Sequence, residues 1–115
     1  MIGGLRASFV SEKTMSKEWR VGQLNALDRM LTDGREALCE GMYQDLHKSH
    51  FEGYMQEIAM MQQEIYDALA HLDHWMGEEL VNTNLFNAPA SSCVRSDPLG
   101  VVLILGAWNY KPVAC

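Results

Sequence analysis

The stretch from Asp97 to Tyr110, DPLGVVLILGAWNY, joins a turn signal, the most apolar run of the chain and a group of aromatic and polar residues. The residue before a proline is pushed out of the helical region, so Asp97–Pro98 interrupts any regular element. Gly100–Leu105 is apolar, rich in β-branched residues and without alternation, which is typical of a strand buried on both faces of a parallel sheet covered by helices. The stretch therefore predicts a buried strand that ends at Gly106.

Asn109 follows this predicted strand closely. Parallel-sheet proteins place ligand and catalytic groups there, beyond the carboxyl end of a strand. The side-chain NH₂ of an asparagine can donate a hydrogen bond to a developing oxyanion. An asparagine that caps an element or forms a turn fits the same spacing. The residues by themselves leave both interpretations open.

Helical periodicity dominates the chain upstream. Lys17–Leu31 and Asp33–Lys48 are predicted to be two helices with a break at Thr32–Gly34, and Met1–Ser11 a short helix before them. The fold class that follows is a mostly α segment, with helices over 17–48 and 54–76, followed by one or two β-strands.

The helix predicted over 54–76 has the clearest pattern, because its apolar residues recur at intervals of three or four and form one stripe. Gly77 is placed to end it. The stripe consists of Tyr54, Ile58, Met61, Ile65, Ala68, Leu72 and Trp75. An irregular link rich in Asn, Ser and Ala follows, and Ser92–Ser96 is predicted to be extended.

Charge and composition exclude several classes of partner. The formal net charge is −6, and no Lys or Arg occurs between Ser49 and Val94, so a nucleic-acid partner is disfavoured. The longest apolar stretch, Leu99–Ala107, is far short of the roughly 20 residues that a transmembrane helix needs. The histidines of HKSH and HLDH have no further ligand at a defined spacing, so no metal site is predicted.

The three cysteines, Cys39, Cys93 and Cys115, are widely spaced and odd in number. This usage fits reduced thiols in the cytoplasm better than a disulfide framework. None of them follows a recognisable nucleophile motif, so each is interpreted as an inert thiol.

Asp97–Tyr110 resembles the first strand and following turn of the aldehyde dehydrogenase superfamily, especially its class 3 branch. The pattern there is an acidic residue, Pro-Leu-Gly, an apolar strand, Gly and then Trp-Asn-Tyr. The segments RVGQLNALDRML and DLHKSHFEGYMQEI precede it in a similar order and spacing, so the resemblance covers roughly residues 4–110.

The resemblance implies that Asn109 donates to the oxyanion of the thiohemiacetal that forms when a cysteine attacks an aldehyde. It also implies that a pocket for NAD or NADP is lined by Leu105, Gly106, Ala107 and Trp108. The implied parent fold is α/β, with a Rossmann-like cofactor domain, a catalytic domain and a strand-built oligomerisation element. This chain would supply its leading helices and first strands.

On this resemblance the chain divides into an N-terminal helical segment over 1–80, an irregular link with the first strands of the cofactor and oligomerisation region over 81–110, and a divergent tail over 111–115. The divergence begins at Lys111, where the family has Pro and then Phe. No residue matches the family's nucleophilic cysteine, general-base glutamate, Gly-rich turn or cofactor-contacting lysine. We therefore expect a truncated enzyme that neither oxidises aldehydes nor binds the cofactor alone.

Two other interpretations stay open. The chain could be a helical interaction module that associates with full-length aldehyde dehydrogenase subunits, because the stripe and the apolar strand both need a partner. It could also be a free-standing, mostly helical protein in which Val101–Leu105 is protected. The expected partners are an aldehyde substrate in the parent family and a homo-oligomer or full-length relative, and the expected location is cytoplasmic.

Overall fold

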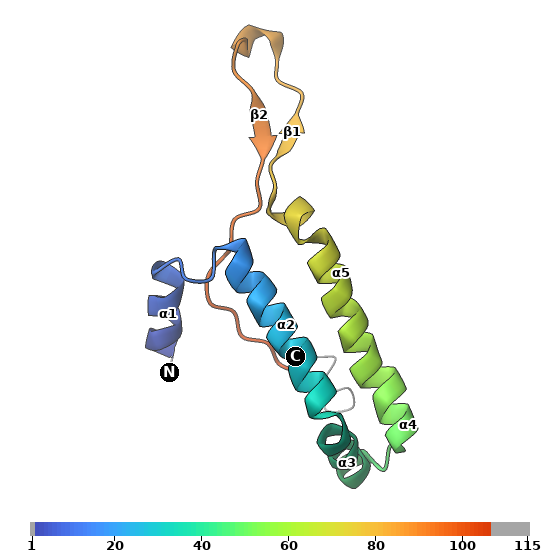
Figure 1. The fold of residues 1–115 in the computed structure, drawn as a ribbon. Coiled ribbons are helices and arrows are strands. Elements are labelled where there is room, and N and C mark those ends of the chain that lie inside the picture. Colours follow the sequence, from blue (N-terminus) through green and yellow to red (C-terminus); the bar gives the residue numbers. More distant parts are fainter. Residues whose placement is uncertain (1, 107–115) are drawn as a thin grey trace.

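A helical body with a projecting β-hairpin makes up the computed structural model, which describes residues 2–106 (Figure 1). The principal extents are 64 × 32 × 24 Å and the radius of gyration is 19.2 Å, whereas a compact domain of this length would have a radius of about 13 Å. The molecule is therefore elongated. No helix within the described range is long and apolar enough to cross a membrane.

The helices and strands follow one another along the chain in the order of Figure 1. The elements are the α-helices α1 (Ile2–Val10), α2 (Lys17–Asp33), α3 (Arg35–Leu46) and α4 (His50–Gly53), the π-helix η1 (Tyr54–Ile58), α5 (Ala59–Met76), strand β1 (Glu79–Val81), the 3-10 helix η2 (Leu85–Asn87) and strand β2 (Ser92–Val94).

The predicted break between the two leading helices is confirmed at Gly34. Its N–H donates to the Met30 carbonyl at 2.9 Å and closes α2, and α3 begins at the next residue. A Cβ at position 34 would lie 2.8 Å from the Met30 oxygen, so the close approach requires glycine. At the other end, Ser16 Oγ accepts a hydrogen bond from the Trp19 N–H and caps α2.

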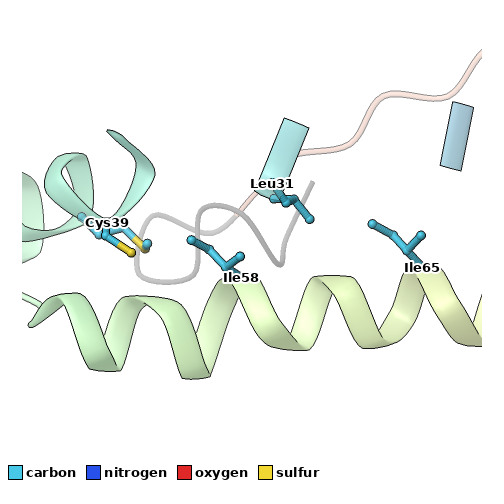
Figure 2. Close-up of a cluster of buried hydrophobic side chains, with 5 residues drawn as sticks. Leu31, Cys39, Ile58 and Ile65 are labelled. Atoms are coloured by element: carbon cyan, nitrogen blue, oxygen red, sulfur yellow. The ribbon is translucent and has the colours of Figure 1, made fainter. Parts of the chain in front are cut away.

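The core lies where α2 and α3 pack against the helical run of η1 and α5 (Figure 2). The stripe of the predicted helix provides one side of it, because Ile58, Ile65 and Leu72 are buried. Leu31 of α2 packs against the same cluster, together with Cys39 and Met42 of α3. Trp75, at the end of the stripe, is 53% exposed. Its ring stacks on that of His71.

The predicted helix over 54–76 is confirmed at its end and begins earlier than expected. Ser49 Oγ accepts a hydrogen bond from the Glu52 N–H and caps α4, so the helical run starts at His50. The run continues through η1 into α5 and ends at Met76, where Gly77 donates to the His74 carbonyl.

The strands form a two-stranded antiparallel hairpin, with Leu80 opposite Cys93 at its centre. The extended segment predicted over Ser92–Ser96 is confirmed in β2, while β1 was not predicted. Figure 1 shows the hairpin projecting from the end of α5, away from the helical body.

The predicted strand over Gly100–Leu105 is wrong, because residues 100–106 belong to no helix or strand. A strand buried on both faces depends on neighbouring strands and covering helices, and among the described residues the one sheet is the hairpin of β1 and β2, which does not pair with this segment. Its side chains stay in solvent: the exposed fractions are 83% for Leu103 and 85% for Leu105.

Candidate functional site

The predicted catalytic and cofactor residues lie at the limit of the described chain. Leu105 is largely exposed, and with Gly106 it belongs to the irregular segment that follows Gly100. Ala107, Trp108 and Asn109 lie outside the described residues. The oxyanion donor and the cofactor contacts therefore stay predictions from the sequence.

An open cavity of about 470 Å³ lies where the segment after β2 meets the helical body. Arg20 of α2 and Trp75 of α5 line its helical side, and Arg95 and Asp97 line the other. Arg95 Nε donates to Asp97 Oδ1 at 3.1 Å, while Arg20 Nε donates to the Thr14 carbonyl at 3.0 Å. Both guanidinium groups are thus bonded to nearby parts of the chain. The cavity lies at the junction between the helical body and the segment that follows β2.

Gly100 turns the chain at the entrance to the apolar run. Its φ of +120° lies in the region that side chains other than glycine rarely adopt. This backbone conformation explains why a glycine occupies the third position of the Pro-Leu-Gly pattern, which the sequence alone did not explain.

A buried ion pair between Lys48 and Glu57 is the main polar feature that sequence reasoning missed. The Glu57 side chain is 0% exposed and that of Lys48 is 14% exposed. Lys48 Nζ donates to Glu57 Oε1, while Oε2 has no hydrogen-bond partner among the residues described. A signal was present, because Glu57 stands three residues after Tyr54 and four before Met61, on the side of the apolar stripe.

The histidines do not gather into one site. His47 ends α3, with Nδ1 3.0 Å from the Tyr43 carbonyl oxygen, whereas the His50 ring faces carboxylates of α3. His71 Nδ1 lies 2.8 Å from the Asp67 carbonyl oxygen on α5. Within residues 2–106 no group of three or more His, Cys, Asp or Glu side chains is arranged to hold a metal ion.

The described cysteines differ in environment. Burial raises the pKa of the Cys39 thiol, the nearby Glu36 carboxylate raises it further, and Arg35 opposes them. Cys39 is therefore a neutral thiol, and its Sγ donates to the His50 carbonyl at 3.6 Å. Cys93 is an exposed free thiol in β2, and Cys115 lies outside the described residues.

Comparison with known proteins gives relatives along nearly the whole chain, although no protein-family model matches it. The chain is 42% identical over 110 residues to an aldehyde dehydrogenase of Craterostigma plantagineum, an alignment that covers 96% of this chain and 23% of the relative. It is 45% identical over 106 residues to aldehyde dehydrogenase family 3 member B1 of Bos taurus, with 92% and 23% covered. The chloroplastic family 3 member I1 of Arabidopsis thaliana is 37% identical, with 96% and 20% covered. The chain thus spans about a fifth of the length of these relatives.

Proposed function

Because the chain belongs to the aldehyde dehydrogenase superfamily, as an N-terminal-type fragment similar to family 3 members, we propose that these 115 residues by themselves do not oxidise aldehydes. The parent enzyme would oxidise aldehydes to carboxylic acids with NAD or NADP. A nucleophile and a base are both needed for that chemistry, and no residue of this chain matches those of the family.

In this proposal Asn109 keeps the role of oxyanion donor, and Leu105, Gly106, Ala107 and Trp108 keep the role of cofactor contacts. Removal of one oxyanion donor typically lowers kcat by about 10²–10³, so Asn109 would matter in a complete enzyme. Alone, it has no thiohemiacetal to stabilise. We propose that the isolated chain does not bind NAD or NADP either.

The observation that carries the proposal is the exposure of the run that leads to this site. Leu99 is 99% exposed and Val102 is 69% exposed, in the stretch that resembles the family's first strand. A fully buried side chain of this kind contributes roughly 1.5–3 kcal/mol. The run gains little of that free energy in this chain, as expected of a strand whose sheet is supplied by other segments.

Aldehyde-dependent reduction of NAD and NADP tests the proposal. The purified chain is incubated with an aliphatic and an aromatic aldehyde, and bovine family 3 member B1 serves as the positive control for the assay. We expect absorbance of the reduced cofactor to stay at the blank level for the chain. Turnover above the blank with either cofactor would contradict the proposal.

A second candidate function is association with full-length aldehyde dehydrogenase subunits. The apolar stripe along η1 and α5 is not free to bind a partner, because Ile58, Ile65 and Leu72 are already buried within this chain. The apolar run over 99–105 remains available, with its exposed side chains. Exposed apolar segments of high β-propensity tend to pair with other chains, so this run would be the contact segment, either to a relative or to a second copy.

Co-expression with a tagged full-length relative tests this association. We expect the chain to co-purify, and the substitution Leu103→Lys to abolish co-purification, because a charge would enter the apolar contact. Phe51→Lys is the matched control. Phe51 is also an exposed apolar residue, at 76% against 83% for Leu103, but it lies on α4, away from the proposed contact segment. A chain that never co-purifies, or that loses its partner equally with both substitutions, would argue against this function.

We also propose a cytoplasmic location, which rests on the unpaired thiols of Cys39 and Cys93. Fractionation of cells that express the tagged chain tests it. Recovery in an organelle or secreted fraction would contradict it.

A further inference from the structure

The cavity between the helical body and the segment after β2 has the size of a small-molecule site. Its volume is about 470 Å³, and pockets for small ligands measure about 300–1,000 Å³. Trp75 and Met76, the last two residues of α5, belong to its apolar lining. Trp75 is 53% exposed, and the His71 ring stacks on its indole. The cavity therefore presents an aromatic surface to a ligand.

Four charged side chains line the same cavity, and only two of them pair. Arg95 Nε and Asp97 Oδ1 lie 3.1 Å apart, so these two charges neutralise each other. Glu12 and Arg20 form no ion pair, with each other or with any other residue in the range 2–106. The lining thus holds one anion and one cation without a charged partner among the described residues.

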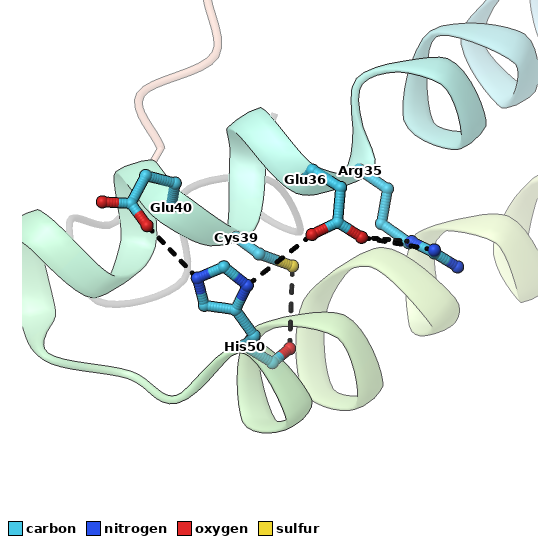
Figure 3. Close-up of polar contacts among 5 residues, drawn as sticks. All are labelled: Arg35, Glu36, Cys39, Glu40 and His50. Atoms are coloured by element: carbon cyan, nitrogen blue, oxygen red, sulfur yellow. Dashed lines mark hydrogen bonds and ion pairs between the residues drawn. The ribbon is translucent and has the colours of Figure 1, made fainter.

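Other charges on the surface of this chain do meet their opposites. Arg35 and Glu36 lie 3.3 Å apart on α3 (Figure 3), and Lys17 pairs with Asp73 across α2 and α5. The opposite charges of the cavity are brought into one lining but stay too far apart for a direct ion pair. A ligand that carries both signs can pair with each of them.

The backbone fixes both of these charged residues. Arg20 is half-buried, and its Nε donates to the Thr14 carbonyl at 3.0 Å, while Nη2 lies 4.0 Å from Met15 Sδ. A guanidinium has further N–H donors, which remain for an acceptor in the cavity. Glu12 has a φ of 57°, which residues other than glycine rarely adopt, and its N–H donates to the Phe9 carbonyl at 3.0 Å.

We propose that this cavity binds a free α-amino acid with an apolar side chain. Arg20 donates to the carboxylate of the amino acid, the Glu12 carboxylate accepts from its ammonium group, and its side chain packs against Trp75. A zwitterion has no net charge, so the net charge of −6 on the chain does not repel it as it repels a simple anion. Figure 1 shows the segment after β2 running past the start of α2, so the site is built without the predicted cofactor residues.

Titration of the full chain with L-phenylalanine, followed by NMR of the Trp75 indole N–H, tests the proposal. Trp75→Phe assigns the signal, and we expect it to shift with a saturable dependence on the amino acid. N-acetyl-L-phenylalanine lacks the ammonium group and resembles a peptide C-terminus, whereas L-phenylalaninamide lacks the carboxylate and resembles an N-terminus. Each should bind about tenfold more weakly, because each loses a hydrogen bond between charged groups. Equal binding of either analogue would assign the site to a peptide end and overturn the proposal.

Two substitutions separate the two charges. Glu12→Gln should weaken the binding of L-phenylalanine by about tenfold and leave that of N-acetyl-L-phenylalanine unchanged, because the acetylated analogue has no ammonium group to lose. Arg20→Met should weaken L-phenylalanine likewise and leave L-phenylalaninamide unchanged. Glu18→Gln and Arg29→Met are the matched controls, since both residues are exposed on α2 outside the cavity lining, and both variants should bind as the unmodified chain does.

Circular dichroism establishes that each variant is folded. Arg20 also bonds the Thr14 carbonyl, so if Arg20→Met does not fold, the exposed Glu12→Gln and the two analogues carry the test. The absence of a saturable shift in the unmodified chain up to the solubility of L-phenylalanine would overturn the proposal. Undiminished binding by a folded Glu12→Gln, or an equal loss in the Glu18→Gln control, would also overturn it.

Discussion

Glu57 and Lys48 form an ion pair that the core almost completely excludes from water. Removal of one partner leaves an uncompensated buried charge, which costs about 3–5 kcal/mol. We expect Lys48→Met to lower the free energy of unfolding by about that amount in urea denaturation followed by circular dichroism. The double variant Lys48→Met/Glu57→Met should recover part of the loss, because no charge then remains buried.

Lys17→Met is the control for this measurement, because Lys17 pairs with Asp73 at 2.5 Å on the surface, where the side chains are 46% and 75% exposed. Exposed pairs contribute about 0–1 kcal/mol. A loss for Lys48→Met no larger than that for Lys17→Met would show that the buried pair does not stabilise the fold.

The two described cysteines should differ in reactivity. Alkylation requires the thiolate, and burial raises the pKa of Cys39, so its thiolate is scarcer at a given pH than that of an ordinary thiol. We expect iodoacetamide to label the exposed Cys93 much faster than Cys39 at pH 8, as measured by mass spectrometry of proteolytic peptides. Equal labelling rates in the folded chain would contradict the burial of Cys39.

At the scale of helices, substitution by alanine should change the stability in opposite directions at two glycines, Gly22 within α2 and Gly34 between α2 and α3. A Cβ at Gly22, in α2, meets no atom within 4 Å, whereas one at Gly34 would lie 2.8 Å from the Met30 oxygen. Gly22→Ala should raise stability by about 0.5–1 kcal/mol. Gly34→Ala should lower it by about 1–3 kcal/mol, because the neighbouring backbone must shift. Thermal unfolding measures both, and effects of the same sign would contradict the helix junction.

The helices could be predicted because their signals are local. The break at Thr32–Gly34 and the spacing of the stripe from Tyr54 to Leu72 are properties of neighbouring residues along one helix. The strand β1 could not, since Glu79–Val81 is only three residues long and is defined by pairing with β2 across a loop. The prediction for Gly100–Leu105 was wrong for a related reason: its pattern is that of a strand inside a larger sheet, and residues 2–106 build only the hairpin of β1 and β2.

The candidate site could be predicted only in part. The resemblance at Asp97–Tyr110 names Asn109 and its neighbours, and the relatives agree with the family it indicates. The cavity at Arg20 and Trp75 could not be predicted, because it depends on how the ends of α2 and α5 lie against the segment after β2. The buried Glu57 had a positional signal, but its partner lies nine residues away in a loop.

At the scale of the whole molecule, the elongated shape and the exposed apolar surface both indicate incomplete packing. The chain has a radius of gyration of 19.2 Å, well above the value of about 13 Å for a compact domain of its length. It also exposes a contiguous apolar segment, Leu99–Leu105, of a kind that monomeric proteins rarely expose. Both features are expected if these residues complete their packing only with the remaining four-fifths of the relatives' length.

We infer that the apolar run needs a sheet from other segments to become a strand, and amide hydrogen exchange of Val101–Leu105 in the isolated chain is the measurement that decides it. We predict that these amides exchange at the rate of an unstructured peptide, while those of α2 and α5 are protected in the same sample. Protection of Val101–Leu105 comparable to that of α5 in a monodisperse monomer would show that the run is structured without a sheet from other segments, and would favour a free-standing protein.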